Sequence, residues 1–209
     1  MIIHDRYWEV FNNRYNDRYD IALISLHHHP LEINNRVVPA PLAEQNRRDI
    51  VAYSEVTVAG WGHTRREEHP QFAQKGKPRV LTHQDCLAFA AQSPDIVYNE
   101  HFHFCYVGRQ IPNTIQYRIV PSQNSAQGDS GGPVIDEDGV VVGIIMSGVT
   151  DINIQNMPVS DLPCLAIDIR TFRYWIDQKM AEKEKKLFFD QIKINDGFNA
   201  DEEWDFDDE

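Results

Sequence analysis

One serine stands among glycines beyond the middle of the chain, in the sequence QGDSGGP at residues 127–133. Three glycines over this length suit neither a strand nor a helix, and they permit a tight turn that exposes the serine hydroxyl and gathers backbone N–H groups beside it. Converging N–H donors stabilise the oxyanion that forms when a carbonyl group is attacked. The residue types therefore predict that Ser130 is a nucleophile for acyl transfer, the alternative being a flexible turn without chemistry.

Short β-type segments separated by turn residues surround this serine, with a reversal signal at residues 136–139 (DEDG). Many short strands at such spacing favour an all-β barrel or sandwich. The expected strands are Ile21–Leu26, Glu55–Ala59, Arg79–Thr82, Ile115–Val120, Pro133–Ile135, Val140–Met146 and Cys164–Ile169.

One helix is predicted near the end of the chain. Apolar residues at positions 172, 175, 176 and 180 lie three or four apart and would share one helix face. We expect this helix to run from about Thr171 towards Ile194. The extended stretch at residues 37–41 (VVPAP) suits a connector between two units.

The net charge of −12 is concentrated in a tail, because residues 196–209 hold eight acidic side chains and no basic one. A block of like charge stays solvated, so we expect a disordered tail, with docking on a basic partner as the alternative. Acidity disfavours nucleic-acid binding. No apolar run reaches the roughly 18 residues that a membrane span requires. Residues 1–20 contain no apolar segment typical of a secretory signal.

The cysteines and histidines give no strong metal signal. Three cysteines permit at most one disulfide within the chain, and their spacings do not suit a zinc site. The histidine run at 27–29 is interpreted as a solvated loop. His101 and His103 would share one strand face, yet no third ligand is evident. We expect neither a metal nor an organic cofactor.

The QGDSGGP string resembles the nucleophile motif of the chymotrypsin (trypsin-like) family of serine proteases, and further segments repeat the resemblance in the family's order. Residues 19–26 (YDIALISL) look like the segment that holds the catalytic aspartate, and residues 59–62 (AGWG) look like the glycine-tryptophan-glycine strand. Residues 143–145 (GII) resemble the strand beside the substrate cleft. Pro163, followed by Trp175 and Ile176, resembles the last strand and the terminal helix. The resemblance covers about residues 2–177.

This resemblance implies an all-β, trypsin-like fold of Greek-key barrels with a C-terminal helix. Residues 1–45 would be a remnant of the first barrel, carrying the aspartate and a connector. Residues 46–177 would form the complete second barrel, which carries the nucleophile and ends in the helix. Residues 178–209 would form a helical extension and the acidic tail.

Carried over residue by residue, the resemblance assigns catalytic roles to Asp20 and Ser130. Ser130 would form the acyl-enzyme, and Asp20 would orient and stabilise the imidazolium of the base. The N–H groups of Gly128 and Ser130 would form the oxyanion hole. Asp129 would be an activation switch that pairs with a newly released amino terminus.

The same resemblance assigns a substrate pocket and a disulfide between Cys86 and Cys105, which favours an oxidising compartment. Asn124 would form the pocket floor, and it carries no charge for binding Arg or Lys. Ala126 stands where the family has a cysteine, so Cys164 would be a free thiol or the partner of a cysteine that is missing from this sequence. Met146 replaces the family's serine beside the cleft, unless a one-residue bulge returns Ser147 to that role. The pocket residues are Asn124, Ser125, Gln127, Ser147 and Gly148.

The general base is missing from the pattern. The family order is His, then Asp, then Ser, whereas His4 is too close to Asp20 and the other histidines lie downstream. The simplest interpretation is an amino-terminally truncated, secreted serine endopeptidase that acts on polypeptides and is inactive alone. The alternative is a non-catalytic homologue that binds a protein partner as a regulatory module.

Overall fold

The structure is a computed structural model that describes residues 1–9, 16–26, 29–64, 70–91, 97–108, 124–148 and 163–195, without the side chains of 147–148 and 189–195. The chain divides into two compact units, Met1–Arg173 and Tyr174–Glu209. The first unit contains the whole β structure. The expected strand Ile115–Val120 and the acidic tail lie outside the described residues, and the domain boundaries at 45 and 177 stay predictions.

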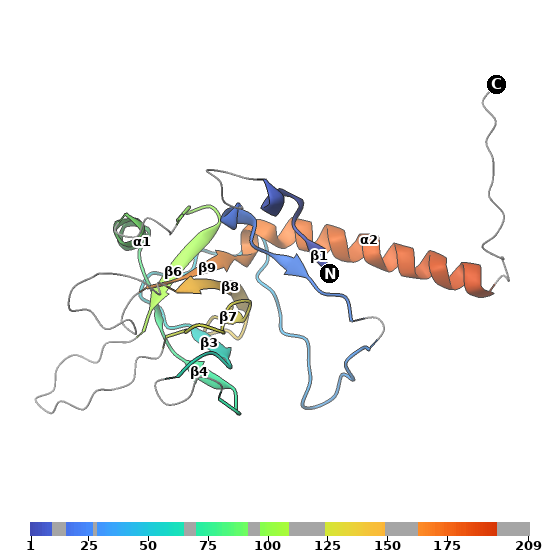
Figure 1. Cartoon of the computed structure of the whole chain (residues 1–209), viewed down its shortest axis with the longest axis horizontal. Coiled ribbons are helices and arrows are strands. Elements are labelled where there is room, and N and C mark those ends of the chain that lie inside the picture. The colour runs from blue at the N-terminus through green and yellow to red at the C-terminus, as the bar shows by residue number, and fades with distance from the viewer. Residues whose placement is uncertain are drawn as a thin grey trace, which may run out of the picture. The chain divides into compact units, whose positions relative to one another are not determined.

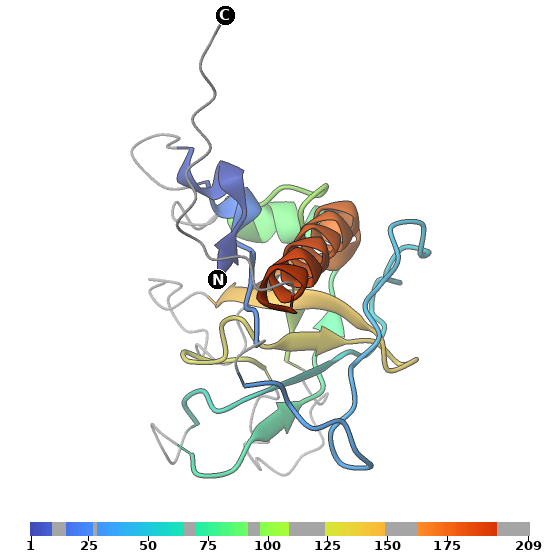
Figure 2. The same cartoon turned by 90° about the vertical axis from the view of Figure 1, so that its right-hand side faces the viewer.

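Seven antiparallel strands form one curled sheet in the first unit (Figure 1). Their order in the sheet is β4-β3-β7-β8-β9-β6-β5. Their bounds are Thr57–Gly60 (β3), Gln74–Gly76 (β4), Arg79–Val80 (β5), His103–Val107 (β6), Pro133–Ile135 (β7), Val141–Gly148 (β8) and Cys164–Asp168 (β9). Figure 2 shows the teal β3 and β4 below the yellow β7 and β8. The all-β expectation is confirmed.

The two ends of this sheet meet, because the chain entering β3 pairs with the edge strand β5. Glu55 forms an isolated antiparallel bridge with Arg79. The Val56 N–H donates to the Pro78 carbonyl at 2.9 Å, and the Val80 N–H donates to the Ser54 carbonyl at 3.0 Å. Pairing opposite edges removes unpaired strand groups, which is how a sheet becomes a barrel.

The core lies on β6, β8 and β9. All five residues of β9 are buried, in agreement with the continuous apolar run that a strand covered on both faces requires. Leu165 and Ile167 of β9 and Tyr106 of β6 are 0% exposed. Burying an aliphatic or aromatic side chain stabilises a fold by about 1.5–3 kcal/mol. The expected strand Cys164–Ile169 is thus found nearly as predicted.

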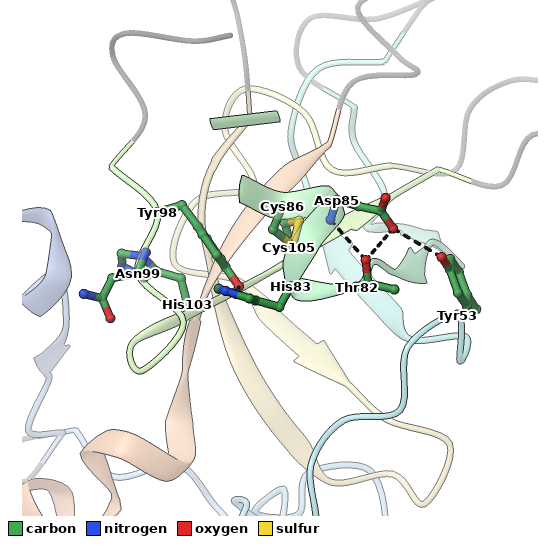
Figure 3. The surroundings of a disulfide bond; sticks show 9 residues. All are labelled: Tyr53, Thr82, His83, Asp85, Cys86, Tyr98, Asn99, His103 and Cys105. Atoms are coloured by element: carbon green, nitrogen blue, oxygen red, sulfur yellow. Dashed lines mark hydrogen bonds between the residues drawn. A yellow bond between two sulfur atoms is a disulfide. The ribbon is translucent and has the colours of Figure 1, made fainter. Parts of the chain in front are cut away.

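Helix α1, His83–Ala90, was not predicted, although its start carries a capping signal. Thr82 is the N-cap, and its hydroxyl oxygen accepts from the Asp85 N–H at 3.0 Å. The disulfide between Cys86 and Cys105 joins α1 to β6 with a Cα–Cα distance of 5.9 Å (Figure 3). The pairing expected from the resemblance is therefore present.

The amino-terminal part of the first unit is less regular. Strands β1 (Ile2–Ile3) and β2 (Ala22–Leu23) form a separate two-stranded sheet, and two short 3₁₀ helices, η1 (Asp5–Trp8) and η2 (Asp17–Tyr19), lie between them in sequence. The expected strand Ile21–Leu26 is shorter than predicted because its partner offers only two residues.

Helix α2, Ile169–Asn195, confirms the predicted terminal helix and starts two residues earlier than expected. The Asp168 carboxylate accepts from the Arg170 N–H at 3.0 Å at the start of this helix. No helix among the described residues is long and apolar enough to cross a membrane.

Candidate active site

The loop that carries Ser130 is a glycine-dependent turn in front of β7. Gly128 and Gly131 adopt φ values of +96° and +83°, which residues with a side chain rarely adopt. The Gly132 N–H donates to the Asp129 carbonyl at 2.9 Å, and the Gly131 N–H donates to the Ile145 carbonyl of β8 at 2.8 Å. The glycines predicted to permit a tight turn do so, and β8 holds the turn in place.

The Asp129 carboxylate faces inward and binds two backbone N–H groups. Its Oδ1 accepts from the Gly62 N–H at 2.7 Å, and its Oδ2 accepts from the Ala126 N–H at 2.8 Å. A Cβ at Gly60 would lie 2.1 Å from Oδ1, and a Cβ at Gly62 would lie 2.5 Å from Cγ. The glycines on both sides of Trp61 therefore make the room that this carboxylate occupies.

A second bond fixes the peptide between Gln127 and Gly128. The His63 N–H donates to the Gln127 carbonyl at 2.8 Å. In a planar trans peptide the carbonyl and the following N–H point in opposite directions, so this bond also directs the Gly128 N–H away from His63. Nothing in the sequence pattern singled out His63, although it directly follows the glycine-tryptophan-glycine segment.

The N–H groups of Gly128 and Ser130 are open within the described part of the loop. Within the described residues, neither the Gly128 N–H nor the Ser130 N–H donates to any acceptor. The intervening Asp129 N–H, by contrast, donates to the Ala126 carbonyl at 3.0 Å. The open pair belongs to the two residues that the resemblance assigns to the oxyanion hole, and it is chemically suited to an anionic oxygen.

The Ser130 side chain is accessible, and no imidazole among the described residues is its partner. Ser130 is an exposed residue, and its hydroxyl donates to the Met146 carbonyl at 3.2 Å. None of the histidines that the structure describes forms a hydrogen bond with this hydroxyl. His4 instead stacks on Tyr19 at 4.8 Å between ring centroids, and His83 Nε2 lies 3.0 Å from a carboxylate oxygen of Glu100.

Asp20 is an exposed residue that directly follows η2. Its N–H donates to the Asp17 carbonyl at 3.3 Å. Desolvation of the Asp20 carboxyl group, and secondly the negative charge of Asp17, raise its pKa above the ordinary value. No hydrogen bond joins Asp20 to Ser130 across the described residues, so their shared role in catalysis stays a prediction.

The predicted pocket residues fall on the nucleophile loop and on the end of β8. Asn124 and Ser125 are half-buried, and Gln127 is exposed. Ser147 and Gly148 are the last two residues of β8, where the register against β9 shifts between Ile145 and Ser147. Met146 is therefore the extra residue of a bulge, as one of the two alternatives requires, and the role of Ser147 beside the cleft stays a prediction.

Two further features bear on cofactors. No group of three His, Cys, Asp or Glu side chains in the described ranges could hold a metal ion. Cys164 is a buried free thiol, and burial raises its pKa to about 11. His27 and His28 lie outside the described residues.

Sequence comparisons point in one direction. The sequence model of the Trypsin family matches residues 4–176. Human (Homo sapiens) kallikrein-12 is 30% identical over 132 residues, covering 62% of this chain and 45% of that protein. Mouse (Mus musculus) transmembrane protease serine 11C is 25% identical, covering 86% and 37%. Trypsin epsilon of Drosophila erecta is 24% identical, covering 78% and 55%. The chain thus spans about half the length, or less, of these relatives.

Solved structures show the same fold. The structure of GrC has a TM-score of 0.51 and 24% identity, covering 72% of this chain and 56% of that one. A variant of human heparin binding protein has a TM-score of 0.52 and 20% identity, covering 72% and 53%.

Proposed function

The chain belongs to the trypsin family of serine proteases, and on that premise we propose that it carries the nucleophile half of a serine endopeptidase. In this proposal Ser130 attacks the carbonyl carbon of a peptide bond, and the N–H groups of Gly128 and Ser130 hold the oxyanion. The C–N bond then breaks as the base passes the Ser130 proton to the leaving amine, and water hydrolyses the resulting acyl-enzyme to release the acid and regenerate the hydroxyl. Asp20 orients and stabilises the imidazolium of the base.

One observation carries the proposal: the open N–H pair beside an accessible serine. The loop uses its other polar groups internally, with both Asp129 oxygens bound to N–H groups and the Gln127 carbonyl bound to His63. Donors fixed in advance cost no reorganisation when charge develops, and one such donor is worth about 100- to 1000-fold in kcat.

The state of Asp129 extends the proposal to activation. As an activation switch, Asp129 would pair with a released amino terminus, yet two N–H groups of its own chain already hold it inward. We therefore expect that such pairing would reinforce this arrangement of the loop.

The proposed mechanism also needs a general base, and no segment of this sequence matches the family's histidine segment. A serine hydroxyl is a weak nucleophile at neutral pH unless a base accepts its proton. The carboxyl group of Asp20, whose charged form is disfavoured by desolvation and by Asp17, would gain from a cationic imidazolium beside it. We propose that this imidazole comes from outside these 209 residues and that polypeptides are the substrates.

A second candidate is a non-catalytic homologue that binds a protein partner. It is favoured by the Ser130 hydroxyl, which donates to the Met146 carbonyl at 3.2 Å, so that no base accepts its proton. In either case the disulfide between Cys86 and Cys105 supports an oxidising, extracellular location.

Labelling with a fluorophosphonate probe, read by mass spectrometry, separates the two candidates. We expect no label on the 209-residue chain, because loss of a triad member costs about four orders of magnitude or more in rate. A form extended upstream to include a base and an activation site should label at Ser130, with Ser130→Ala as the control that does not.

Each other outcome has a definite meaning. Rapid labelling of the short chain at Ser130 would show that one of its own residues serves as the base. An extended, activated form that folds and fails to label would contradict the enzyme and support the partner-binding homologue.

A further inference from the structure

Three residues form a row across neighbouring strands at one end of the sheet. Cys164 of β9 is paired with Gly148 of β8 on one side and with Tyr106 of β6 on the other. Residues directly opposite each other in antiparallel strands present their side chains to the same face. The thiol of Cys164 and the phenol ring of Tyr106 are therefore neighbours.

The segment at residues 124–126 lies against this row. The Ser125 hydroxyl and the Tyr106 hydroxyl form a hydrogen bond of 2.7 Å. The Cys164 thiol donates to the Ser125 carbonyl at 3.7 Å. Tyr106 is 0% exposed and Cys164 is 3% exposed, so both side chains lie in the interior against Ser125.

Neither side chain adds charge to this place. Burial raises the pKa of Cys164 to about 11. Burial also raises the pKa of Tyr106 well above its ordinary value. The Asp129 carboxylate, whose charge acts on both groups, is already bound by two backbone N–H groups. A cation that entered here would meet a neutral phenol and a neutral thiol where it would need a carboxylate in direct contact, which is costly.

We propose that Tyr106 and Cys164 form the base of the substrate pocket, behind Asn124 and Ser125, and close it to the long cationic side chains of Arg and Lys. Short uncharged side chains are then the class that the pocket accepts. This inference rests on the pocket assignment of the proposed function and names the substrate class of that site.

The test measures binding of benzamidinium, a flat aromatic cation, by titration calorimetry. The wild-type chain and Asn124→Asp should not bind it measurably, because the thiol blocks the space that a new carboxylate would need. Asn124→Asp combined with Cys164→Gly should bind it measurably, with an affinity at least about tenfold above the detection limit that Asn124→Asp does not reach. A hydrogen bond to a charged group allows a gain of this size. The matched control, Asn124→Asp combined with Cys164→Ser, keeps the bulk and should behave like Asn124→Asp.

Two results would overturn the inference. Tight binding by Asn124→Asp alone would show that Tyr106 and Cys164 leave the pocket open. No gain in the glycine variant, with its disulfide and circular dichroism intact, would show that Cys164 does not line the pocket. Binding needs neither nucleophile nor base, so failure of fluorophosphonate labelling and failure of this test are separate results.

Discussion

The loop that holds Ser130 and the segment that holds Asp20 differ in how the chain fixes them. The loop at 124–132 is tied by carboxylate, carbonyl and N–H bonds to β8 and to the residues after β3. The segment at 16–54 leaves many large apolar side chains at least half exposed, among them Ile24, Leu26, Leu31, Ile33, Val38 and Val51. The oxyanion geometry is therefore fixed by bonds between the loop and the sheet, whereas the segment that holds Asp20 is fixed mainly by Tyr19 and Ile21, the two buried residues on either side of Asp20.

The largest expected effect concerns His103, which lies in β6 on the sheet side of this comparison. Burial, and secondly the Arg18 charge, lower the pKa of His103 from 6.5 to about 4. Between these values the unfolded chain binds a proton that the folded chain does not, so stability falls as the pH falls. The free energy of unfolding should drop by about 3 kcal/mol from this group between pH 7 and pH 4.

Urea unfolding of the wild type and of His103→Asn at both pH values checks this. The asparagine can keep an acceptor for the Asn99 N–H, which donates to His103 Nδ1 at 3.2 Å, and it does not titrate. The variant should show a pH dependence smaller by the amount given above, while the exposed neighbour variant His101→Asn should match the wild type. Equal pH dependence in all three proteins would mean that His103 is not enclosed.

Removing the disulfide should have the next largest effect, because it is the covalent link between α1 and the sheet. The double variant Cys86→Ala/Cys105→Ala frees a loop with a sequence separation of 19, and its unfolding free energy should fall by about 3 kcal/mol. Cys164→Ala, which removes only the buried free thiol, is the matched control and should lose about 1 kcal/mol. Equal losses in chemical unfolding would show that the bridge adds nothing beyond packing.

The two predicted site aspartates compare the regions directly. Asp129→Ala removes the acceptor of two N–H groups and should lower the unfolding free energy by about 2 kcal/mol, whereas Asp20→Ala should change it by less than about 0.5 kcal/mol. Thermal and urea unfolding of both variants give the values. A larger loss at Asp20 than at Asp129 would reverse the comparison.

The smallest effect is expected from the exposed apolar side chains of the amino-terminal segment. Ile24 and Val38 are each 72% exposed, so Ile24→Ala and Val38→Ala should each change the unfolding free energy by less than about 0.5 kcal/mol. A loss above about 1.5 kcal/mol in either variant would show that this segment packs as firmly as the sheet does.

Much of the sheet follows from local sequence. Strands β7, β8 and β9 were predicted within about two residues, because apolar runs there are bounded by clear turns such as the DEDG reversal. Strand β4 was missed because Gln74, Lys75 and Gly76 carry no β signal, and pairing with β3 alone makes them a strand. Helix α1 was missed because eight residues give little periodicity, although the Thr82 to Asp85 spacing was a usable capping signal.

At the candidate site, sequence motifs predicted some residues and missed the contacts between them. The motif identified Ser130 and its glycines, and the resemblance supplied the disulfide pairing. The bond from His63 to Gln127, the bulge at Met146 and the contact of Tyr106 with Ser125 join residues far apart in sequence. Such pairings depend on strand register and on closure of the barrel, which no single segment encodes.

The central claim is that the loop is formed with two N–H groups held open, and amide hydrogen exchange followed by ¹⁵N NMR tests it most directly. The amides of Gly62 and Ala126, which donate to the Asp129 carboxylate, should be protected. The amides of Gly128 and Ser130 should exchange rapidly. Protection of the Gly128 and Ser130 amides, or equal exchange at all four positions, would contradict a preformed oxyanion site.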